Sequence, residues 1–282
     1  MTPIGEGERR ELERAAVRVR RAILRMLKAG RSGHLGGALS CADILTALYF
    51  NVMRVDPRRP DWRERDRFVL SAGHKCLALY AVLSERGFLD ECVLDTYGAN
   101  CTRLGGHPDM HKVPGIETNT GALGHGLAIA GGMAMGLKLD AIDARVYVVT
   151  GDGELAEGSN WEAAAAASHH RLDNLVVFVD RNRLQICGPT ADVMNCEPLD
   201  RRWEAFGWEV RVIDGHDMGQ IVACAAGAPF VAGRPSVVIA DTVKGKGLSF
   251  AENRAEFHYW KATEEGLAIA ERELLQAEER IK

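Results

Sequence analysis

The sequence predicts an α/β protein with a doubly wound, mostly parallel sheet flanked by helices, and three observations support this class. Valine-rich runs at residues 146–150 and 175–179 have the composition of strands that are buried on both faces. A helical segment at residues 159–170 lies between them, as the crossover between two parallel strands requires. Three further apolar runs complete a five-stranded sheet, at residues 68–70, 209–213 and 236–240.

Helices are predicted between and around these strands. Residues 8–29 form an amphipathic pattern that ends at Gly30, a residue type common at helix C-caps. In the crossover helix, Ser159 is expected to be the N-cap, with Glu162 in the capping-box position. The remaining helices are expected at residues 40–50 (from Ser40 or Ala42), 75–86, 127–139, 218–226 and 266–281. Residues 97–117 have no clear period, and a loop of that length inside a compact domain is usually functional.

Bulk composition limits the functional classes. The 282 residues are 46% hydrophobic, enough for one large α/β domain, so residues 1–282 are expected to form a single domain. A net charge of −4 lacks the basic field that nucleic acid or an anionic membrane would require. No uninterrupted apolar run reaches about 18 residues, so no membrane span is expected. The 7 cysteines form no C-x-x-C pair, which is typical of reduced thiols in a cytoplasmic protein.

Polar residues follow two of the predicted strands. Asp152 lies between Gly151 and Gly153 directly after the run at 146–150, and Asn182 follows the next strand. Ligands of open parallel sheets bind at the carboxyl ends of the strands, and glycines there let the backbone approach a phosphate and supply free N–H groups. A carboxylate, an amide oxygen and a backbone carbonyl suit Mg²⁺ or Ca²⁺ bridging a diphosphate. The alternative is that Asp152 and Asn182 only cap loops.

This arrangement resembles the diphosphate-binding motif of thiamine-diphosphate enzymes, in which G-D-G is followed by a closing Asn. The segments G-D-G-E-L-A-E-G-S-N-W-E-A and V-D-R-N-R-L-Q-I-C-G are similar to the transketolase family, in particular to the N-terminal, diphosphate-binding subunit of a split transketolase. The resemblance implies thiamine diphosphate as cofactor and Mg²⁺ as metal, with Ca²⁺ or Mn²⁺ as substitutes. It also implies that Asp152, Asn182 and the carbonyl of Leu184 hold the metal, and that Gly153 touches the diphosphate.

Further motifs extend the resemblance: S-G-H-L-G, S-A-G-H, G-G-H-P, T-G-A-L-G-H-G, and D-T-V-K-G-K-G followed by a histidine. Four of their histidines lie in predicted loops, where a histidine is as often a solvated surface residue as a catalyst: His34, His74, His107 and His258. The resemblance implies cofactor contacts from His74, Gly121, Ala122, Leu123, Gly151, Asp152, Gly153, Glu154, Asn182, Lys244 and His258. The sequence assigns no role to His111, His125, His169, His170 or His216.

Catalytic roles follow from the same resemblance. His34 and His107 are expected to contact hydroxyl groups of the donor sugar, and His258 to lie near the reacting centre. Imidazole suits this work because it can hold or release a proton near neutral pH, which contributes about 10²- to 10⁴-fold per step. Glu157 matches a glutamate that in the family reaches toward the partner's cofactor-activating carboxylate. The alternative for Glu157 is a solvated charge near a helix N-terminus.

The resemblance also implies a partner. It extends from about Ala15 to His258, whereas a full transketolase also carries a pyrimidine-binding domain and a C-terminal domain. These domains are therefore expected on a separate C-terminal subunit, in a two-plus-two heterotetramer that transfers a two-carbon ketol unit between sugar phosphates. Two alternatives stay open. The chain is either a subunit of another thiamine-diphosphate enzyme that acts on an unusual sugar, such as a sulfo- or deoxysugar, or a non-catalytic subunit that kept the fold.

Some positions depart from the family pattern. Tyr259 and Trp260 follow His258 where many relatives have His-Gly, so the substrate channel is expected to be reshaped. Lys244 and Lys246 bracket a glycine and either attract a phosphate or sulfonate of the substrate or are solvated surface charges.

Overall fold

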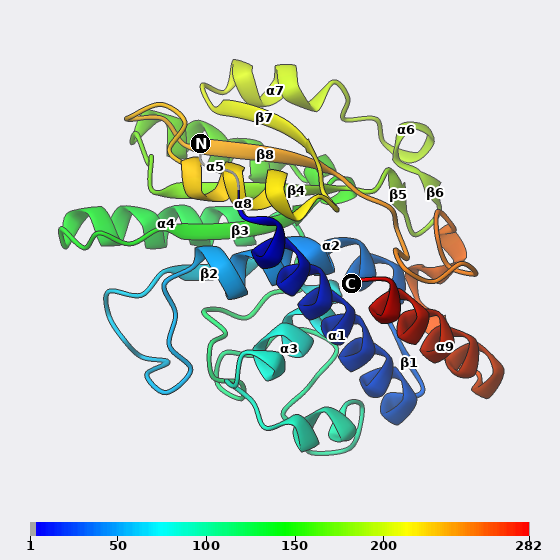
Figure 1. Ribbon diagram of the computed structural model, residues 1–282. Coiled ribbons are helices and arrows are strands. Elements are labelled where there is room, and N and C mark those ends of the chain that lie inside the picture. The colour runs from blue at the N-terminus through cyan, green and yellow to red at the C-terminus, as the bar shows by residue number, and fades with distance from the viewer. Residues whose placement is uncertain (1–3, 282) are drawn as a thin grey trace.

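The computed structural model describes residues 4–281, and at its centre is a five-stranded parallel sheet (Figure 1). The strand order is β2-β3-β4-β8-β7, and every neighbouring pair is parallel. The strands span Arg67–Leu70 (β2), Val146–Gly151 (β3), Leu175–Arg181 (β4), Glu209–Asp214 (β7) and Ser236–Asp241 (β8). The predicted fold class and the five predicted strands are confirmed.

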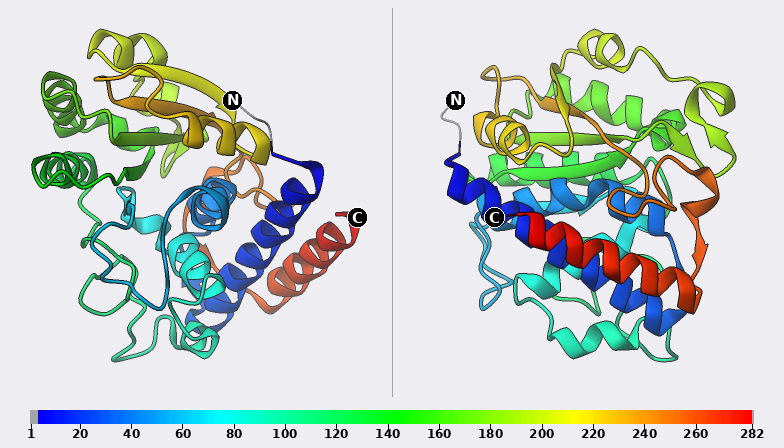
Figure 2. Two further views of the ribbon diagram at one scale, coloured as in Figure 1. Left: turned by 60° about the vertical axis from the view of Figure 1, so that its left-hand side comes forward. Right: turned by 45° about the vertical axis from the view of Figure 1, so that its right-hand side comes forward.

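One face of the sheet carries a deep helical layer. The side chains of Tyr147, Val149 and Phe178 point into it and belong to the larger of the two hydrophobic clusters. The helices of this layer are α1 (Glu6–Gly30), α2 (Leu35–Ala47), α3 (Cys76–Glu85), α8 (Met218–Gly227) and α9 (Glu264–Arg280). All 13 residues of α2 are buried, and α9 lies along α1 on the outside (Figure 2). By length and composition alone Leu35–Val52 is apolar enough to cross a membrane, but 83% of that segment is buried in the fold as a core helix.

The other face carries a thinner layer. Val148, Val177 and Ile239 point into the second hydrophobic cluster, against α4 (Gly126–Leu139), α5 (Gly158–His169) and α7 (Leu199–Ala205). Trp208 is buried there and donates its indole N–H to the carbonyl of Ala164 on α5 at 2.9 Å. The alternation of side chains along β3 and β4 therefore fills two separate cores, one for each layer.

Several short elements were not predicted. Two antiparallel pairs lie outside the main sheet, β1 (Ser32–Gly33) with β9 (Trp260–Lys261), and β5 (Leu184–Gln185) with β6 (Gly188–Pro189). The remaining short helices and turns are α6 (Thr190–Val193), η1 (Leu48–Val52), η2 (Gly73–Lys75), η3 (Glu91–Thr96), η4 (Gly153–Ala156) and η5 (Ala255–His258). The β1–β9 pair joins segments from opposite ends of the chain, and it brings the residues next to His34 and His258 together.

Three predicted helix ends are wrong. Gly30 is the last residue of α1, and the left-handed cap is Arg31, with φ of 61°. Ser159 does not cap α5, since its hydroxyl donates to the carbonyl of Gly124 at 2.9 Å and Glu157 holds the N-cap position. The second helix begins at Leu35, well before the predicted start. The helix can start there because its early glycines admit lysine stems, and a Cβ on Gly36 would lie 2.9 Å from Cγ of Lys244.

Candidate cofactor site at the strand ends

A cavity of about 320 Å³ opens at the carboxyl ends of β3, β4 and β8. Most residues predicted for the site line it: His34, His74, Gly121, Leu123, Gly151, Asp152, Gly153, Glu154, Asn182, Leu184, Lys244 and His258. Five lining residues were not predicted, namely Gly37, Lys75, Gln185, Ile186 and Cys187. Segments from the whole chain therefore converge on one cavity, as expected for the edge where parallel strands end.

Asp152 is nine-tenths buried and is held by backbone groups. Its Oδ1 accepts the N–H of Gly153 at 2.9 Å, and its Oδ2 accepts the N–H of Arg183 at 2.6 Å. Burial, together with the negative charge of Asp180, raises the pKa of the Asp152 carboxyl to about 6. Such a carboxylate is poorly compensated by the protein alone, so a bound cation would stabilise its charged form.

The other two predicted metal ligands face the same cavity. The amide oxygen of Asn182 accepts the N–H of Leu184 at 3.1 Å. The carbonyl of Leu184 accepts from the ammonium of Lys244 at 3.0 Å, so this oxygen already has a cationic partner. One carboxylate, one amide oxygen and one carbonyl are a donor set for a hard divalent ion. Within residues 4–281 no cluster of three or more His, Cys, Asp or Glu side chains is arranged to hold a metal, which agrees with a site built mainly from neutral oxygens.

A buried ion pair lies beneath this acidic end. The ammonium of Lys75 is 2.6 Å from Oδ2 of Asp180, and both side chains are almost fully buried. Ser40 and Thr242 donate their hydroxyls to the same carboxylate. Burial alone would raise the pKa of Asp180, but the charge of Lys75 outweighs it and holds this pKa below its ordinary value. Lys75 follows S-A-G-H directly, so its position in a motif was the one sequence signal for it, whereas nothing in the apolar α2 sequence marked Ser40.

Three imidazoles form the opposite wall of the cavity. The ring centroids of His34, His74 and His258 are 5.2 to 5.3 Å apart in each pair. Burial is the main cause of a lowered pKa in each, to about 4 for His34, about 2 for His74 and about 3 for His258, with nearby cationic groups adding to the shift. All three are therefore neutral at pH 7. Lys244 Nζ lies 3.1 Å from Nδ1 of His258, so this nitrogen accepts and Nε2 carries the proton.

Three predicted site residues do not line the cavity. His107 is exposed, and its ring centroid is 6.4 Å from that of His34. It packs over Gly121, since a Cβ there would lie 3.0 Å from the His107 ring. Ala122 and Glu157 are exposed, and the stem of Glu157 lies against Gly124. These residues lie on the rim of the cavity or beside it.

The predicted free N–H groups are wrong in this structure. The N–H of Gly153 is taken by Asp152, and that of Gly151 is accepted by Glu154 at 3.1 Å. Glu154 is itself buried and also accepts the N–H of Gly124 at 3.0 Å and the hydroxyl of Ser71. Buried backbone donors must find partners, and acidic side chains supply them here. Glu154 thus ties β3 to the loop before α4.

The two lysines of the K-G-K-G motif differ. Lys244 is buried beside the cavity, and burial with the charge of Lys75 lowers its pKa to about 8. Lys246 lies 3.8 Å from Glu252 and does not line the cavity. Of the pair, only Lys244 is therefore in place to meet an anionic group of a bound molecule.

Sequence comparison identifies relatives along nearly the whole chain. Residues 12–275 match the family model described as transketolase, thiamine diphosphate binding domain. One of the two apulose-4-phosphate transketolase subunits compared, from Phocaeicola vulgatus, is 45% identical over 271 residues, which cover 96% of each protein. The 6-deoxy-6-sulfo-D-fructose transketolase subunit SqwG of a Clostridium species is 43% identical, over 94% of this chain and 96% of that subunit.

Structure comparison points the same way. A crystal structure of a transketolase variant from Pichia stipitis superimposes with a TM-score of 0.87 at 30% identity. The match covers 93% of this chain but only 40% of the Pichia chain, so this chain spans less than half of that transketolase. The matched part is one domain of a larger enzyme in Pichia and nearly a whole subunit in the two bacterial relatives.

Proposed function

The chain belongs to the transketolase family through its thiamine diphosphate-binding domain, and from this premise we propose that it is the diphosphate-binding subunit of a split transketolase. The observation that carries the proposal is the convergence of Asp152, Asn182 and the carbonyl of Leu184 on one cavity that also holds Lys244. This is the arrangement that a metal-bridged diphosphate requires. When bound, thiamine diphosphate supplies the carbon nucleophile that accepts and passes on a two-carbon ketol unit.

The acidic end would hold the metal and the diphosphate. Asp152 would provide the fixed negative charge, with Asn182 and the Leu184 carbonyl completing the protein ligands of Mg²⁺. Lys244 would then turn from the Leu184 carbonyl toward a phosphate oxygen, because the metal takes over that carbonyl. Gly151 and Gly153 leave room for the diphosphate to approach the backbone. Glu154 would act indirectly, by fixing the two segments between which the cofactor lies.

The imidazole wall would handle the sugar. Neutral His34, His74 and His258 can each donate one hydrogen bond and accept another, which suits hydroxyl groups of a ketose. His107 on the rim would reach the same hydroxyls from outside. Because these rings stay neutral at pH 7, they can take up a proton from the substrate without first losing one. Gly121 and Leu123 line the cavity between the two ends, where the cofactor rings would lie, and Ala122 extends this segment beside the cavity.

A second subunit would complete the site. We propose that it carries the pyrimidine-binding domain and that two copies of each chain assemble, with Glu157 facing the partner across the rim. Relatives of nearly the same length as this chain are named as transketolase subunits, which supports the split architecture. The rest of a full-length transketolase corresponds to the part of the Pichia chain that this chain does not cover.

The substrate is proposed to be an anionic sugar outside the common set. Two relatives are named for apulose 4-phosphate and for a sulfonated fructose, so this part of the family includes unusual ketoses. Tyr259 supports a reshaped channel here, since its ring lies 4.9 Å from that of His34 and its hydroxyl is 2.9 Å from Ser32 Oγ. An aromatic ring at this place narrows the approach to His34.

Calorimetry of the chain with Mg²⁺ and thiamine diphosphate, with and without the partner subunit, tests the proposal. Weak binding alone and tight, metal-dependent binding in the complex are expected, because the pyrimidine ring has no complete pocket in one subunit. Ketol transfer should need both subunits. Normal turnover by the isolated chain would refute the split site. Cofactor binding without turnover, with every plausible partner present, would favour a non-catalytic subunit.

A further inference from the structure

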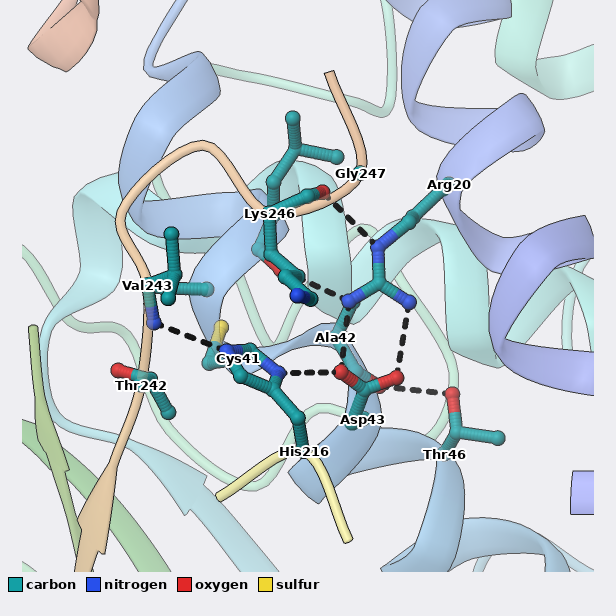
Figure 3. A network of polar contacts seen from close by, with 12 residues as sticks. Arg20, Cys41, Ala42, Asp43, Thr46, His216, Thr242, Val243, Lys246 and Gly247 are labelled. Carbon is teal, nitrogen blue, oxygen red and sulfur yellow. Dashed lines mark hydrogen bonds and ion pairs between the residues drawn. The ribbon is translucent and has the colours of Figure 1, made fainter. Parts of the chain in front are cut away.

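A buried network of three side chains lies behind the cavity (Figure 3). Arg20 of α1 donates from both terminal nitrogens to the carboxylate of Asp43 on α2, at 2.8 and 2.7 Å. His216, in the turn after β7, places Nδ1 2.6 Å from the same carboxylate. The three residues come from distant parts of the sequence, and none of them lines the cavity. Their side chains form what is called here the Arg20–Asp43–His216 network.

The network ends on the loop that carries Lys244. Val243 donates its N–H to Nε2 of His216 at 2.8 Å, and Arg20 donates from Nε to the carbonyl of Lys246 at 3.1 Å. Figure 3 shows both contacts reaching the loop from the same side. The backbone is thus held immediately before Lys244 and two residues after it, by groups that share one carboxylate.

Charge and tautomer are fixed by this geometry. A backbone N–H can only donate, so Nε2 of His216 accepts, and Nδ1 carries the proton that is donated to Asp43. Burial disfavours the charged form of Asp43, but the charge of Arg20 and the hydrogen bonds from Arg20 and His216 outweigh it and lower the pKa of this carboxyl below its ordinary value. The network therefore presents one neutral imidazole, oriented by a carboxylate that is itself fixed by a guanidinium.

The loop needs such support because its own residues impose little order. Gly245 and Gly247 take φ of +78° and +94°, conformations that glycine adopts without strain but that no side chain enforces. The Gly245 N–H also donates to the carbonyl of Gly36 at 3.0 Å, so the network is one of two fixings. Between them, the Lys244 ammonium is aimed at the Leu184 carbonyl and Nδ1 of His258, where the acidic and imidazole ends of the cavity meet.

We propose that the Arg20–Asp43–His216 network positions Lys244, and that His216 acts on cofactor binding through that lysine although it touches neither the cofactor nor the metal. This inference rests on the proposed function, because it assigns Lys244 to the diphosphate. It makes His216 a positioning residue, with a contribution that disappears when Lys244 can no longer contribute.

A double-mutant cycle measures this dependence. The complex of chain and partner is titrated with thiamine diphosphate at saturating Mg²⁺ for the wild type, His216→Phe, Lys244→Met and the double variant. His216→Phe should weaken binding by about 10-fold, the low end of the range for a residue that orients a ligand-binding group. In the Lys244→Met background the same change should have no further effect. His216→Gln, which can still accept from Val243 and donate to Asp43, should restore most of the affinity.

The controls separate the possible failures. His169→Phe, at the exposed end of α5, should leave affinity unchanged. Hydrogen exchange in the peptide covering residues 242–247 should accelerate in His216→Phe and not in this control. If His216→Phe does not fold, Asp43→Asn replaces it in the cycle, since it keeps the shape of the side chain but weakens the hold on Arg20. Additive effects, or wild-type affinity in His216→Phe, would overturn the inference while the proposed function stands. A wild-type complex that binds no cofactor would overturn both.

Discussion

The two ends of the cavity are built in different ways. At the acidic end, Asp152 and Asn182 directly follow adjacent strands, and the carboxylate of Asp180 below them receives three donors from three elements. At the imidazole end, His34 and His258 sit in turns that are joined by a two-residue strand pair and one contact between Tyr259 and Ser32. The sheet fixes the first end, whereas the second depends on short loops.

This difference separates what must stay constant from what can change. A metal–diphosphate site needs its oxygens in one geometry, and strand ends hold them with many buried hydrogen bonds. Sugar recognition needs a surface that can be altered without loss of the cofactor, and loops supply it. The comparison predicts that changes at the acidic end damage the fold or cofactor binding, while changes at the imidazole end leave both largely intact.

The largest effect is expected from Lys75→Met. This change removes the cation from a buried pair and leaves Asp180 uncompensated, which costs about 3–5 kcal/mol of unfolding free energy. Urea denaturation of the isolated chain would measure it. The double variant Lys75→Met/Asp180→Asn should recover part of the loss, and Lys112→Met on the exposed surface should lose almost nothing. A loss below about 1 kcal/mol in Lys75→Met would mean that the acidic end is not held by this pair.

Asp152→Ala should come next. It removes the only fixed negative charge among the proposed metal ligands, so metal-dependent cofactor binding should weaken by about 100-fold or more, above the range for an outer-shell partner. Calorimetry with thiamine diphosphate at several Mg²⁺ concentrations would show it. Asp192→Ala, an exposed carboxylate on α6, is the matched control. Equal affinity in wild type and Asp152→Ala would rule out the metal assignment.

His107→Ala tests the other end. Cofactor affinity should stay within about twofold of the wild type, while the donor KM rises or kcat falls, by up to the 10²-fold lower limit of proton-transfer effects. Steady-state kinetics of the complex would separate the two constants. His111→Ala in the same exposed loop should change neither. If His107→Ala lost cofactor affinity as strongly as Asp152→Ala, the division between the two ends would be wrong.

The pH dependence of stability should also reveal the imidazole end. The ordinary pKa of His34, His74 and His258 is 6.5, and in the folded protein each is lowered to about 4 or less. Below pH 6.5 the unfolded chain therefore binds protons that the folded chain does not, so the free energy of unfolding should fall as pH decreases from 6.5 to about 4. Denaturation at a series of pH values measures the slope, and His74→Gln should make it shallower. An unchanged slope in that variant would contradict the buried neutral state of His74.

The smallest effect is expected from Tyr259→Phe. It removes the contact between the Tyr259 hydroxyl and Ser32 Oγ, which at a half-exposed position contributes no more than about 0.5–1 kcal/mol. Thermal unfolding should shift only slightly and cofactor affinity should not change, while the donor KM responds because the strand pair beside His34 loosens. A change in cofactor affinity would show that the two ends are coupled through this loop.

Much of the fold and of the acidic end could be predicted from the sequence. Valine-rich runs marked each strand, and G-D-G with a closing Asn placed Asp152 and Asn182 at the strand ends. The errors were local. Ser159 has the sequence of a capping residue, but tertiary contact with Gly124 took its hydroxyl. The glycine N–H groups expected to be free are bonded to Asp152 and Glu154, because no sequence pattern shows which side chain will reach a given donor.

By itself, the sequence determined the parallel sheet, the family and the set of residues at the strand ends, because these depend on hydrophobic pattern and on motifs read over a few residues. Only the tertiary structure decided that Lys75 lies under Asp180, 105 residues away, and that His216 reaches Asp43 across 173 residues to hold the loop of Lys244. Such pairs have no local signal, since a buried charge finds its partner by packing. The physical requirement that each be compensated can be stated in advance, but which residue meets it appears only when the chain has folded.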